Sequence, residues 1–417
     1  MMARSLRIGV FVAVGLLAVF SLISFITYLP AIEAARRAGF SDDVIELGLQ
    51  KSFEARLIFW GSQFAQIALL CWLGLTADGR RLAEYWLKSC GSRMWLAALL
   101  MVLTIGIARE LLLLPFNLLG YFHGRRWEML AEQYTLLAWA YDYILSTFLD
   151  GLLLVPSIVI FFWLLKRFPK TWWAIAPAGG AVFAIAYATL APLLLDPLMN
   201  RFVPLEETKW KDLKPQLMAL VGKAEIPVKE ILVMDASKRS SHTNAYFSGF
   251  GSTRRIVLYD TLLKQLSPKE VEAVLAHEIG HWESDHIVYG ILLGVLGMFV
   301  ACWTLDGILI TSLRQEPWLA EAKFDPRLVG WIILLLILGQ WIVRPIENQI
   351  SRIFESQADL RSLELIEDPQ LAIDCEKRMA ISNKSNVAPS PWNTWMFSTH
   401  PSSVQRIERA TSWKPGL

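Results

Sequence analysis

Long apolar runs alternate with polar stretches along most of this 417-residue chain. Tryptophan and tyrosine gather at several ends of these runs, as they do in the interfacial belts of membrane proteins. A helix of about 20 apolar residues crosses the roughly 30 Å of hydrocarbon in a bilayer, so the pattern predicts a mainly α-helical, multi-spanning protein. The seven runs that are long enough lie at about 7–29, 57–77, 94–119, 143–165, 172–195, 287–312 and 328–346.

Two polar stretches, about 200–286 and 347–417, show the patterns of a small mixed domain. In the first we expect an amphipathic helix around Leu213–Val221 and three short strands, followed by one long helix. The strands are expected at Ile231–Met234, Asn244–Phe250 and Arg255–Tyr259, the last two joined by a turn at 251–253. In the second stretch we expect helices after Asp368 and through Arg406, with a loop at 386–394. Two membrane crossings separate the stretches, so both emerge on the same side and can form one domain.

The segment from Ser267 to His286 is predicted to be a single helix. Ser267 suits the N-cap, Pro268 suits the first helical position, and Glu270 completes a capping box. An apolar stripe at helical spacing follows. This segment therefore has a well-defined beginning.

The same segment contains the pattern H-E-x-x-H. His277 and His281 are four residues apart and project from one helix face, so both imidazoles can bind one metal ion. Glu278 lies next to them and can act as a general base toward a water on the ion. A chance match is rare with six histidines in the chain. The motif favours a zinc peptidase.

Catalytic zinc takes three protein ligands, so a third ligand must come from outside the motif. Glu355 has Asp359 four residues on, which places both carboxylates on one helix face. Glu355 could bind the metal while Asp359 accepts a hydrogen bond from a ligand histidine. His400 is the alternative ligand. We weighed four further residues and consider them less suited: His242, Glu283, Asp285 and His286.

Composition supports a membrane protein and excludes several other classes. The chain is 54% hydrophobic with 18 tryptophans, which exceeds the usual composition of soluble enzymes. Its net charge of +2 indicates no nucleic-acid partner. The four cysteines are scattered and form no C-x-x-C pair, so we expect no disulfide partner. Charges inside the apolar runs, Arg109, Glu110 and Asp150, are expected to pair or to line a watery cavity.

Several motifs occur in an order that resembles the type I CAAX prenyl proteases, a family of integral-membrane HExxH zinc metallopeptidases with seven spans. The compact catalytic stretch and the loop after the third run indicate a prokaryotic homologue. The motifs that carry the resemblance lie at Ser240–Phe247, Arg255–Leu262, His277–Trp282, Ser351–Asp359 and His400–Arg406.

The resemblance implies a particular site. One Zn²⁺ ion would be bound by His277, His281 and Glu355, with Asp359 behind a histidine and Glu278 as the base. His400 and Arg406 would contact the substrate or the developing oxyanion. A strand edge would pair with the substrate backbone; it comprises Asn244, Ala245, Tyr246 and Phe247. The helices would enclose a chamber.

The chain is thus expected to be a zinc metalloendopeptidase in the bacterial inner membrane. Its substrates would be peptides or proteins, either prenylated or embedded in the membrane. The expected division is a membrane bundle (1–199), a first catalytic part (200–286), spans six and seven (287–346) and a second catalytic part (347–417). A quality-control endopeptidase for non-prenylated membrane proteins is the first alternative, and a catalytically silent scaffold is the second.

The family resemblance and the charges of the short loops predict opposite orientations of the chain in the membrane. The resemblance places the catalytic domain in the cytoplasm. The short loops hold nine Lys and Arg residues on the side opposite the catalytic domain and six on its own side, which favours an external site. Long loops dilute this rule, so we expect a cytoplasmic active site.

Overall fold

The computed structural model describes residues 4–415 except 92, 195, 227, 229, 249–254 and 316–324. Within these residues, seven helices are long and apolar enough to cross a membrane, so the predicted multi-spanning, mainly α-helical fold is confirmed. They are α1 (Arg4–Ile23), α3 (Asp42–Leu75), α5 (Met94–Arg126), α6 (Leu136–Arg167), α7 (Trp172–Leu194), α12 (His286–Gln315) and α13 (Val329–Ile366).

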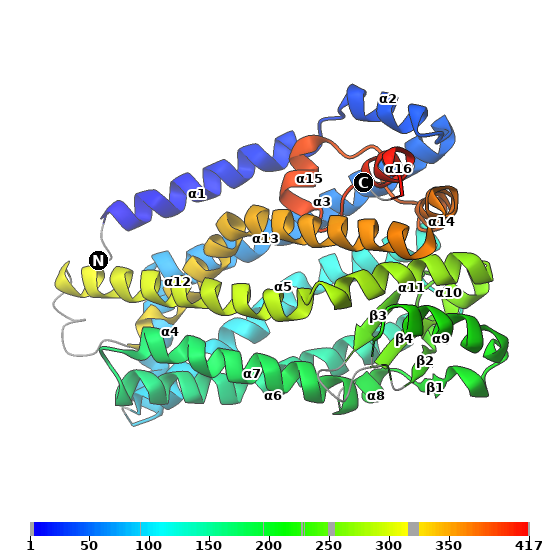
Figure 1. Cartoon of the computed structure of the whole chain (residues 1–417). Helices are drawn as coiled ribbons and strands as arrows, with labels where there is room; N and C mark the ends of the chain where they lie inside the picture. Colours follow the sequence, from blue (N-terminus) through cyan, green and yellow to red (C-terminus); the bar gives the residue numbers. More distant parts are fainter. Residues whose placement is uncertain are drawn as a thin grey trace.

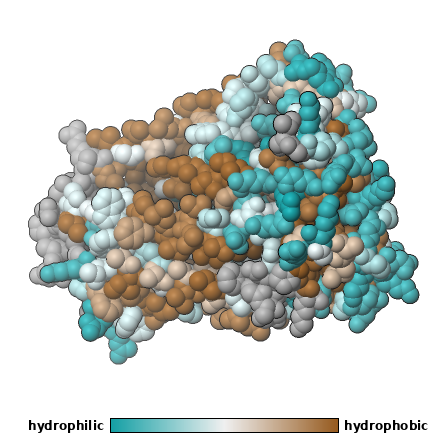
Figure 2. Space-filling view, viewed as in Figure 1, coloured by the Kyte–Doolittle hydropathy of each residue, from teal (hydrophilic) through white to brown (hydrophobic). Residues whose placement is uncertain are grey.

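The long helices extend in a similar direction, and the sheet with its surrounding short helices lies at one end of the bundle (Figure 1). Figure 2 shows apolar residues concentrated over the long helices and hydrophilic residues gathered over the end that carries the sheet. Large apolar side chains of α12, such as Leu292, Leu296 and Trp303, are exposed. Such side chains are suited to lipid rather than water.

The helix α13 is longer than the apolar run that predicted it. It continues without a break for 38 residues, so the seventh span and the polar segment with Glu355 are one rigid element. Likewise α3 begins at Asp42, well before the apolar run at residue 57. Polar helical turns therefore extend the spans beyond their apolar cores and into the hydrophilic end.

A four-stranded sheet has the order β1-β2-β4-β3. Strands β2 and β4 match the prediction, and β3 pairs with β4 in an antiparallel manner, with Ala245 opposite Leu258. β2 and β4 are parallel. The predicted turn at 251–253 lies outside the described residues. The strands are β1 (Phe202–Pro204), β2 (Ile231–Met234), β3 (Ala245–Ser248) and β4 (Arg255–Tyr259).

Shorter helices complete the molecule. In the soluble end they are α8 (Asp196–Met199), α9 (Lys214–Lys223), α10 (Asp260–Gln265), α11 (Pro268–Glu283), α14 (Pro369–Ser382), α15 (Pro391–Phe397) and α16 (Ser403–Ser412). α2 (Leu29–Arg37) shares an apolar cluster with α14 and α16 at the same end, and α4 (Ala77–Ser89) lies elsewhere. Single 3₁₀ turns lie at Leu205–Glu207, Lys211–Leu213, Ala236–Lys238 and Pro326–Leu328. The expected loop at 386–394 was wrong in part, because α15 begins inside it.

The beginning of α11 follows the prediction. The Ser267 hydroxyl accepts a hydrogen bond from the backbone N–H of Glu270 at 3.4 Å, and the Glu270 carboxylate accepts one from Ser267 N–H at 2.7 Å. The predicted end of the helix was wrong: α11 ends at Glu283, and a new helix begins at His286. Between them Asp285 adopts φ 51°, in the left-handed region, and this residue breaks the helix.

An apolar core joins α11 to the sheet and to α9. Side chains from α9, the sheet and α11 meet in this core. Among them are the almost fully buried Leu217, Ile231, Leu258, Leu275 and Ile279. Burial of such side chains is worth about 1.5–3 kcal/mol each. This core holds one face of α11 in place and leaves the opposite face, with its histidines, toward α13.

Candidate metal centre

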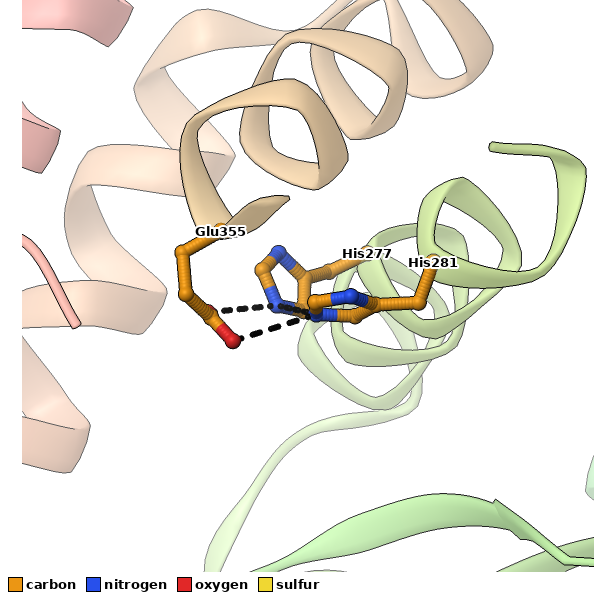
Figure 3. A group of neighbouring side chains, drawn as sticks. All are labelled: His277, His281 and Glu355. Atoms are coloured by element: carbon orange, nitrogen blue, oxygen red, sulfur yellow. Dashed lines mark hydrogen bonds and ion pairs between the residues drawn. The ribbon is translucent and has the colours of Figure 1, made fainter. Parts of the chain in front are cut away.

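Three metal-binding side chains converge between α11 and α13. Glu355 extends from α13 toward the rings of His277 and His281 on α11 (Figure 3). Its two carboxylate oxygens lie 3.3 Å from the Nε2 atoms of His277 and His281, respectively. One ligand atom from each residue lies within 4.8 Å of the others. The three residues that the sequence grouped from separate segments are therefore neighbours in space.

The chemistry of this group fits a cation. The Nε2 atoms of the two histidines face each other at 3.2 Å, and Glu355 Oε2 is buried without a hydrogen-bond partner. A buried carboxylate oxygen without a donor is costly, and an ion between it and the two imidazoles would remove that cost. Two nitrogen ligands and one oxygen ligand are a set that zinc accepts.

A glycine inside the motif permits this approach. A Cβ atom added at Gly280 would lie 2.7 Å from Ala358 Cα and 2.9 Å from its carbonyl oxygen. Only glycine therefore allows α11 to pack this closely against α13. Glu355 is three residues before Ala358, so the same contact brings its carboxylate within reach of the histidines.

Asp359 supports His277 from behind. Its Oδ1 lies 3.0 Å from His277 Nδ1, while Arg409 donates a hydrogen bond to Oδ2 at 2.6 Å and Arg406 donates to both oxygens. Burial alone would lower the pKa of His277, but the nearby carboxylates of Asp359 and Glu355 raise it to about 9. The same two carboxylates would also stabilise the charge of a cation bound at His277 Nε2.

A different pair of residues supports His281, and the sequence does not predict this pair. His281 Nδ1 lies 2.8 Å from His286 Nδ1, and His286 Nε2 lies 2.9 Å from Gln357 Oε1. His286 is 7% exposed. The break at Asp285 produces this position, and nothing in the hydrophobic pattern signals it.

Glu278 lines a cavity of about 170 Å³ together with His277. The cavity is also lined by Asn244, Ala245, His400 and Arg406. Burial raises the pKa of Glu278, and the negative charge of Glu355 acts in the same direction. A carboxylate with a raised pKa is a better proton acceptor near neutral pH.

His400 and Arg406 reach the site from the C-terminal segment. His400 Nε2 lies 3.3 Å from Glu355 Oε1, although its side chain is 60% exposed. Arg406 forms an ion pair with Glu376 at 3.0 Å in addition to its bonds with Asp359. Burial opposes the charge of Arg406, but Glu376 and Asp359 raise its pKa further above its usual range. Both side chains thus place positive or polar groups at the cavity wall.

The strand β3 lies at the edge of the sheet, next to α11. Ala245 and Phe247 face the core, with Phe247 against Trp282 at 5.1 Å between ring centroids. Tyr246 faces the other side, toward Met234 and Tyr259. Its side chains are therefore engaged in packing, so a ligand would meet the backbone of this strand.

The other candidate ligands stay outside the cluster. His242 Nδ1 lies 3.1 Å from Asn383 Oδ1, and Glu283 forms an ion pair with Arg361.

The charged residues inside the third apolar run pair with each other. Arg109 pairs with Glu110 at 2.5 Å and donates a hydrogen bond to Gln66 at 2.6 Å. These residues have structural partners of their own.

Two family models match the chain. The model for peptidase family M48 matches residues 207–414, and the model described as the CAAX prenyl protease N-terminal region with five membrane helices matches residues 51–201.

Similar proteins occur in bacteria and eukaryotes. An uncharacterized metalloprotease of Bacillus subtilis is 27% identical over 78% of this chain and 76% of its own length. The CAAX prenyl protease 1 homolog of Arabidopsis thaliana is 30% identical over 70% of this chain and 68% of its own length. The homolog of Oryza sativa is 36% identical, but only about half of its length, 53%, is covered.

A solved structure shares the fold. The crystal structure of S. mikatae Ste24p superposes with a TM-score of 0.80 at 24% sequence identity and covers 96% of this chain and 97% of that chain. The arrangement of membrane helices and soluble end is therefore the same in both proteins.

Proposed function

The chain belongs to peptidase family M48, together with the CAAX prenyl proteases, and from this premise we propose that it is a membrane zinc endopeptidase whose ion is bound by His277, His281 and Glu355. The observation that carries the proposal is the convergence of these three side chains, whose ligand atoms lie within 4.8 Å of one another. One of these side chains, Glu355, has a buried oxygen, Oε2, without a hydrogen-bond donor. When bound, zinc would supply a Lewis acid that lowers the pKa of a coordinated water to about 7.

Glu278 is the proposed general base. It lies in the cavity beside the histidines, and burial raises its pKa, so it can take a proton from water and return it to the leaving amine. His400 and Arg406 line the same cavity and are the proposed donors to the oxyanion of the cleaved carbonyl. One such donor is typically worth about 3 kcal/mol.

The proposed substrate is a peptide segment that extends beside β3. β3 is an edge strand of the sheet. Ala245 at its beginning and Asn244 directly before it line the cavity. An extended peptide that pairs with this edge would present one of its carbonyl groups to the metal site. Backbone pairing of this kind selects an extended conformation rather than a particular sequence.

Replacement of Glu278 by Gln tests the proposed chemistry. The variant keeps the shape and the hydrogen-bonding groups of the side chain but cannot accept the proton, so we expect a loss of about 10²–10⁴ in the rate of peptide cleavage. Zinc content, measured on the same preparation, should stay at the wild-type level. Cleavage by the variant at the wild-type rate would refute this role.

The names of the CAAX prenyl protease relatives suggest a prenylated C-terminal peptide as the first substrate to test. Cleavage of a farnesylated peptide should be compared with cleavage of the same peptide without the lipid and of an unfolded membrane protein. Preference for the unfolded protein would favour the quality-control alternative. The Glu278→Gln variant, expressed in cells, would retain bound substrate for identification.

We further propose that the catalytic unit is built from residues 200–286 and 347–417 around the spans at 287–346, with the membrane bundle at 1–199. The close packing of α11 on α13 and the boundaries of the two matched regions support this division. The proposed location is the bacterial inner membrane with the catalytic end in the cytoplasm. A reporter fused after Leu417 should be active on the cytoplasmic side only.

A further inference from the structure

The ring of His286 is held in place by three partners, and one of them is a proposed metal ligand. Its Nδ1 lies 2.8 Å from Nδ1 of His281, and its Nε2 lies 2.9 Å from the amide oxygen of Gln357. Phe354 stacks on the ring, with centroids 4.3 Å apart and planes 12° from parallel. The ring is thus fixed on two edges and one face.

The chemistry of these partners gives each hydrogen bond a direction. The amide oxygen of Gln357 can only accept, so Nε2 of His286 carries the proton. The Nδ1 atom of neutral His286 then has a lone pair and accepts the N–H of His281 Nδ1. This leaves the lone pair on Nε2 of His281, which is the atom 3.3 Å from Glu355 Oε1 and 3.2 Å from Nε2 of His277.

We propose that His286 and Gln357 are positioning residues that fix the tautomer and the ring orientation of His281 for metal binding. Hydrogen-bonded partners behind ligand histidines commonly have this role. His277 is supported by the carboxylate of Asp359, whereas His281 would be supported by a neutral pair. The inference rests on the proposed metal site and requires no assumption about the substrate.

The backbone conformation between the two histidines supports the proposal. If α11 continued past Ser284, residue 286 would lie ~140° around the helix axis from residue 281, and the two rings could not meet. Instead Asp285 adopts φ 51°, a left-handed conformation that non-glycine residues rarely adopt. The next helix begins at His286 and brings its ring back against His281.

The two supporting side chains come from the sixth and seventh candidate spans. His286 is the first residue of α12, and Gln357 lies on α13 two residues after Glu355. The orientation of His281 therefore depends on how both membrane helices meet α11. The proposed ligand His281 on α11 is thus joined through His286 and Gln357 to α12 and α13.

Two variants of similar size separate the hydrogen bond from simple packing. His286→Asn keeps an oxygen acceptor close to the position of Nδ1, whereas His286→Leu removes it. Zinc affinity is measured on purified full-length proteins by competition with a chromophoric chelator, and the visible absorption spectrum is recorded after Co²⁺ loading. We expect His286→Leu to bind zinc about 10–100-fold more weakly with an altered Co²⁺ spectrum. His286→Asn should retain affinity and spectrum close to those of the wild type.

The outcomes that contradict the proposal are distinct. Equal weakening in both variants would assign His286 a packing role only, and unchanged affinity in His286→Leu would exclude any role. His123→Leu removes a histidine whose Nε2 contacts the Lys51 carbonyl oxygen instead, and it serves as the matched control. Failure of the wild type to bind zinc would refute the proposed function itself, whereas a wild type that binds zinc beside an unaffected His286→Leu refutes only this inference.

Discussion

Glu355 contacts three histidines, and each contact measures 3.3 Å. The sequence could rank Glu355 above other carboxylates, because Asp359 follows it by four residues and shares its helix face. It could not exclude His400 as the third ligand, since the position of His400 depends on the course of the C-terminal segment. In the structure His400 reaches Glu355 but is not among the three residues that can share one ion.

Of the three residues that support the proposed histidine ligands from outside the metal site, one could be predicted from the sequence and two could not. The position of Asp359 behind His277 follows from helical spacing and could be foreseen. The positions of His286 and Gln357 could not, because they depend on a left-handed residue at 285 that has no glycine to signal it. Regular secondary structure can be read from residue spacing, whereas a single irregular dihedral angle cannot.

The capping carboxylate Glu270 should make stability depend on pH. Burial raises the pKa of Glu270, but hydrogen bonds with Ser267 and the ion pair with Arg378 outweigh burial and lower it below 4.5. Because the folded-state pKa is the lower one, this group stabilises the fold above pH 4.5, and the contribution is lost as the pH falls through the folded-state value. We expect Glu270→Gln to lower the free energy of unfolding by about 1 kcal/mol at pH 7.

Thermal unfolding of both proteins in detergent, at several pH values, measures this difference. The two melting temperatures should converge below pH 4.5. Arg378 is 57% exposed, so water screens its share and the cap accounts for most of the effect. A difference that stays constant down to acidic pH would show that Glu270 acts by shape rather than by charge.

At the scale of elements, the spacing of apolar residues predicted the strands that pack in the core. The strands β2 and β4 were found from their apolar residues, and both are buried in the core. The strand β1 was missed because it has three residues and ends in Pro204. The helix α15 was missed because Pro and Ser dominate its beginning, where Ser390 and Pro391 precede an apolar turn. Short elements carry too few residues for a period to be recognised.

The contact between α11 and α13 should be sensitive to a single methyl group. In Gly280→Ala the new Cβ would lie 2.7 Å from Ala358 Cα, which is backbone and cannot move aside cheaply. We expect a loss of about 1–3 kcal/mol in stability, because the helices must separate. Zinc affinity should fall as well, since Glu355 moves away with α13. Chemical unfolding and chelator competition measure the two effects.

A second glycine offers a matched control for this variant. Gly222 is exposed on α9, and a Cβ added there would meet nothing within 4 Å. Gly222→Ala should therefore stabilise the protein by roughly 0.5–1 kcal/mol, because alanine favours a helix. Equal effects of the two substitutions would mean that the close approach of α11 and α13 does not matter.

At the scale of the whole molecule, hydrogen bonds and an ion pair connect the soluble end to the membrane bundle. Arg239 donates hydrogen bonds to both oxygens of Asp142 on α6, at 2.5 and 3.0 Å. It also donates to the backbone oxygen of Met199 at 2.6 Å. Nearby, Gln133 donates to the backbone of Ser237. The pairing of Arg239 with Asp142 could not be predicted from residue spacing, because 97 positions separate the two residues.

Replacement of Arg239 by Met should weaken this connection. Asp142 would remain largely buried without its cation, so we expect a loss of about 2 kcal/mol in the free energy of unfolding. The double variant Asp142→Asn with Arg239→Met should be more stable than the single variant, because no uncompensated charge remains. Thermal unfolding in detergent measures both. If the single variant unfolds like the wild type, the Arg239–Asp142 ion pair does not contribute to the stability of the protein.

The proposed role of Glu355 as the third ligand is tested most directly by the zinc content of three purified proteins. Mass spectrometry of the metal, after dialysis, should find about one zinc per chain in the wild type and in His400→Ala, and almost none in Glu355→Ala. One zinc per chain in Glu355→Ala, together with its loss in His400→Ala, would contradict the account.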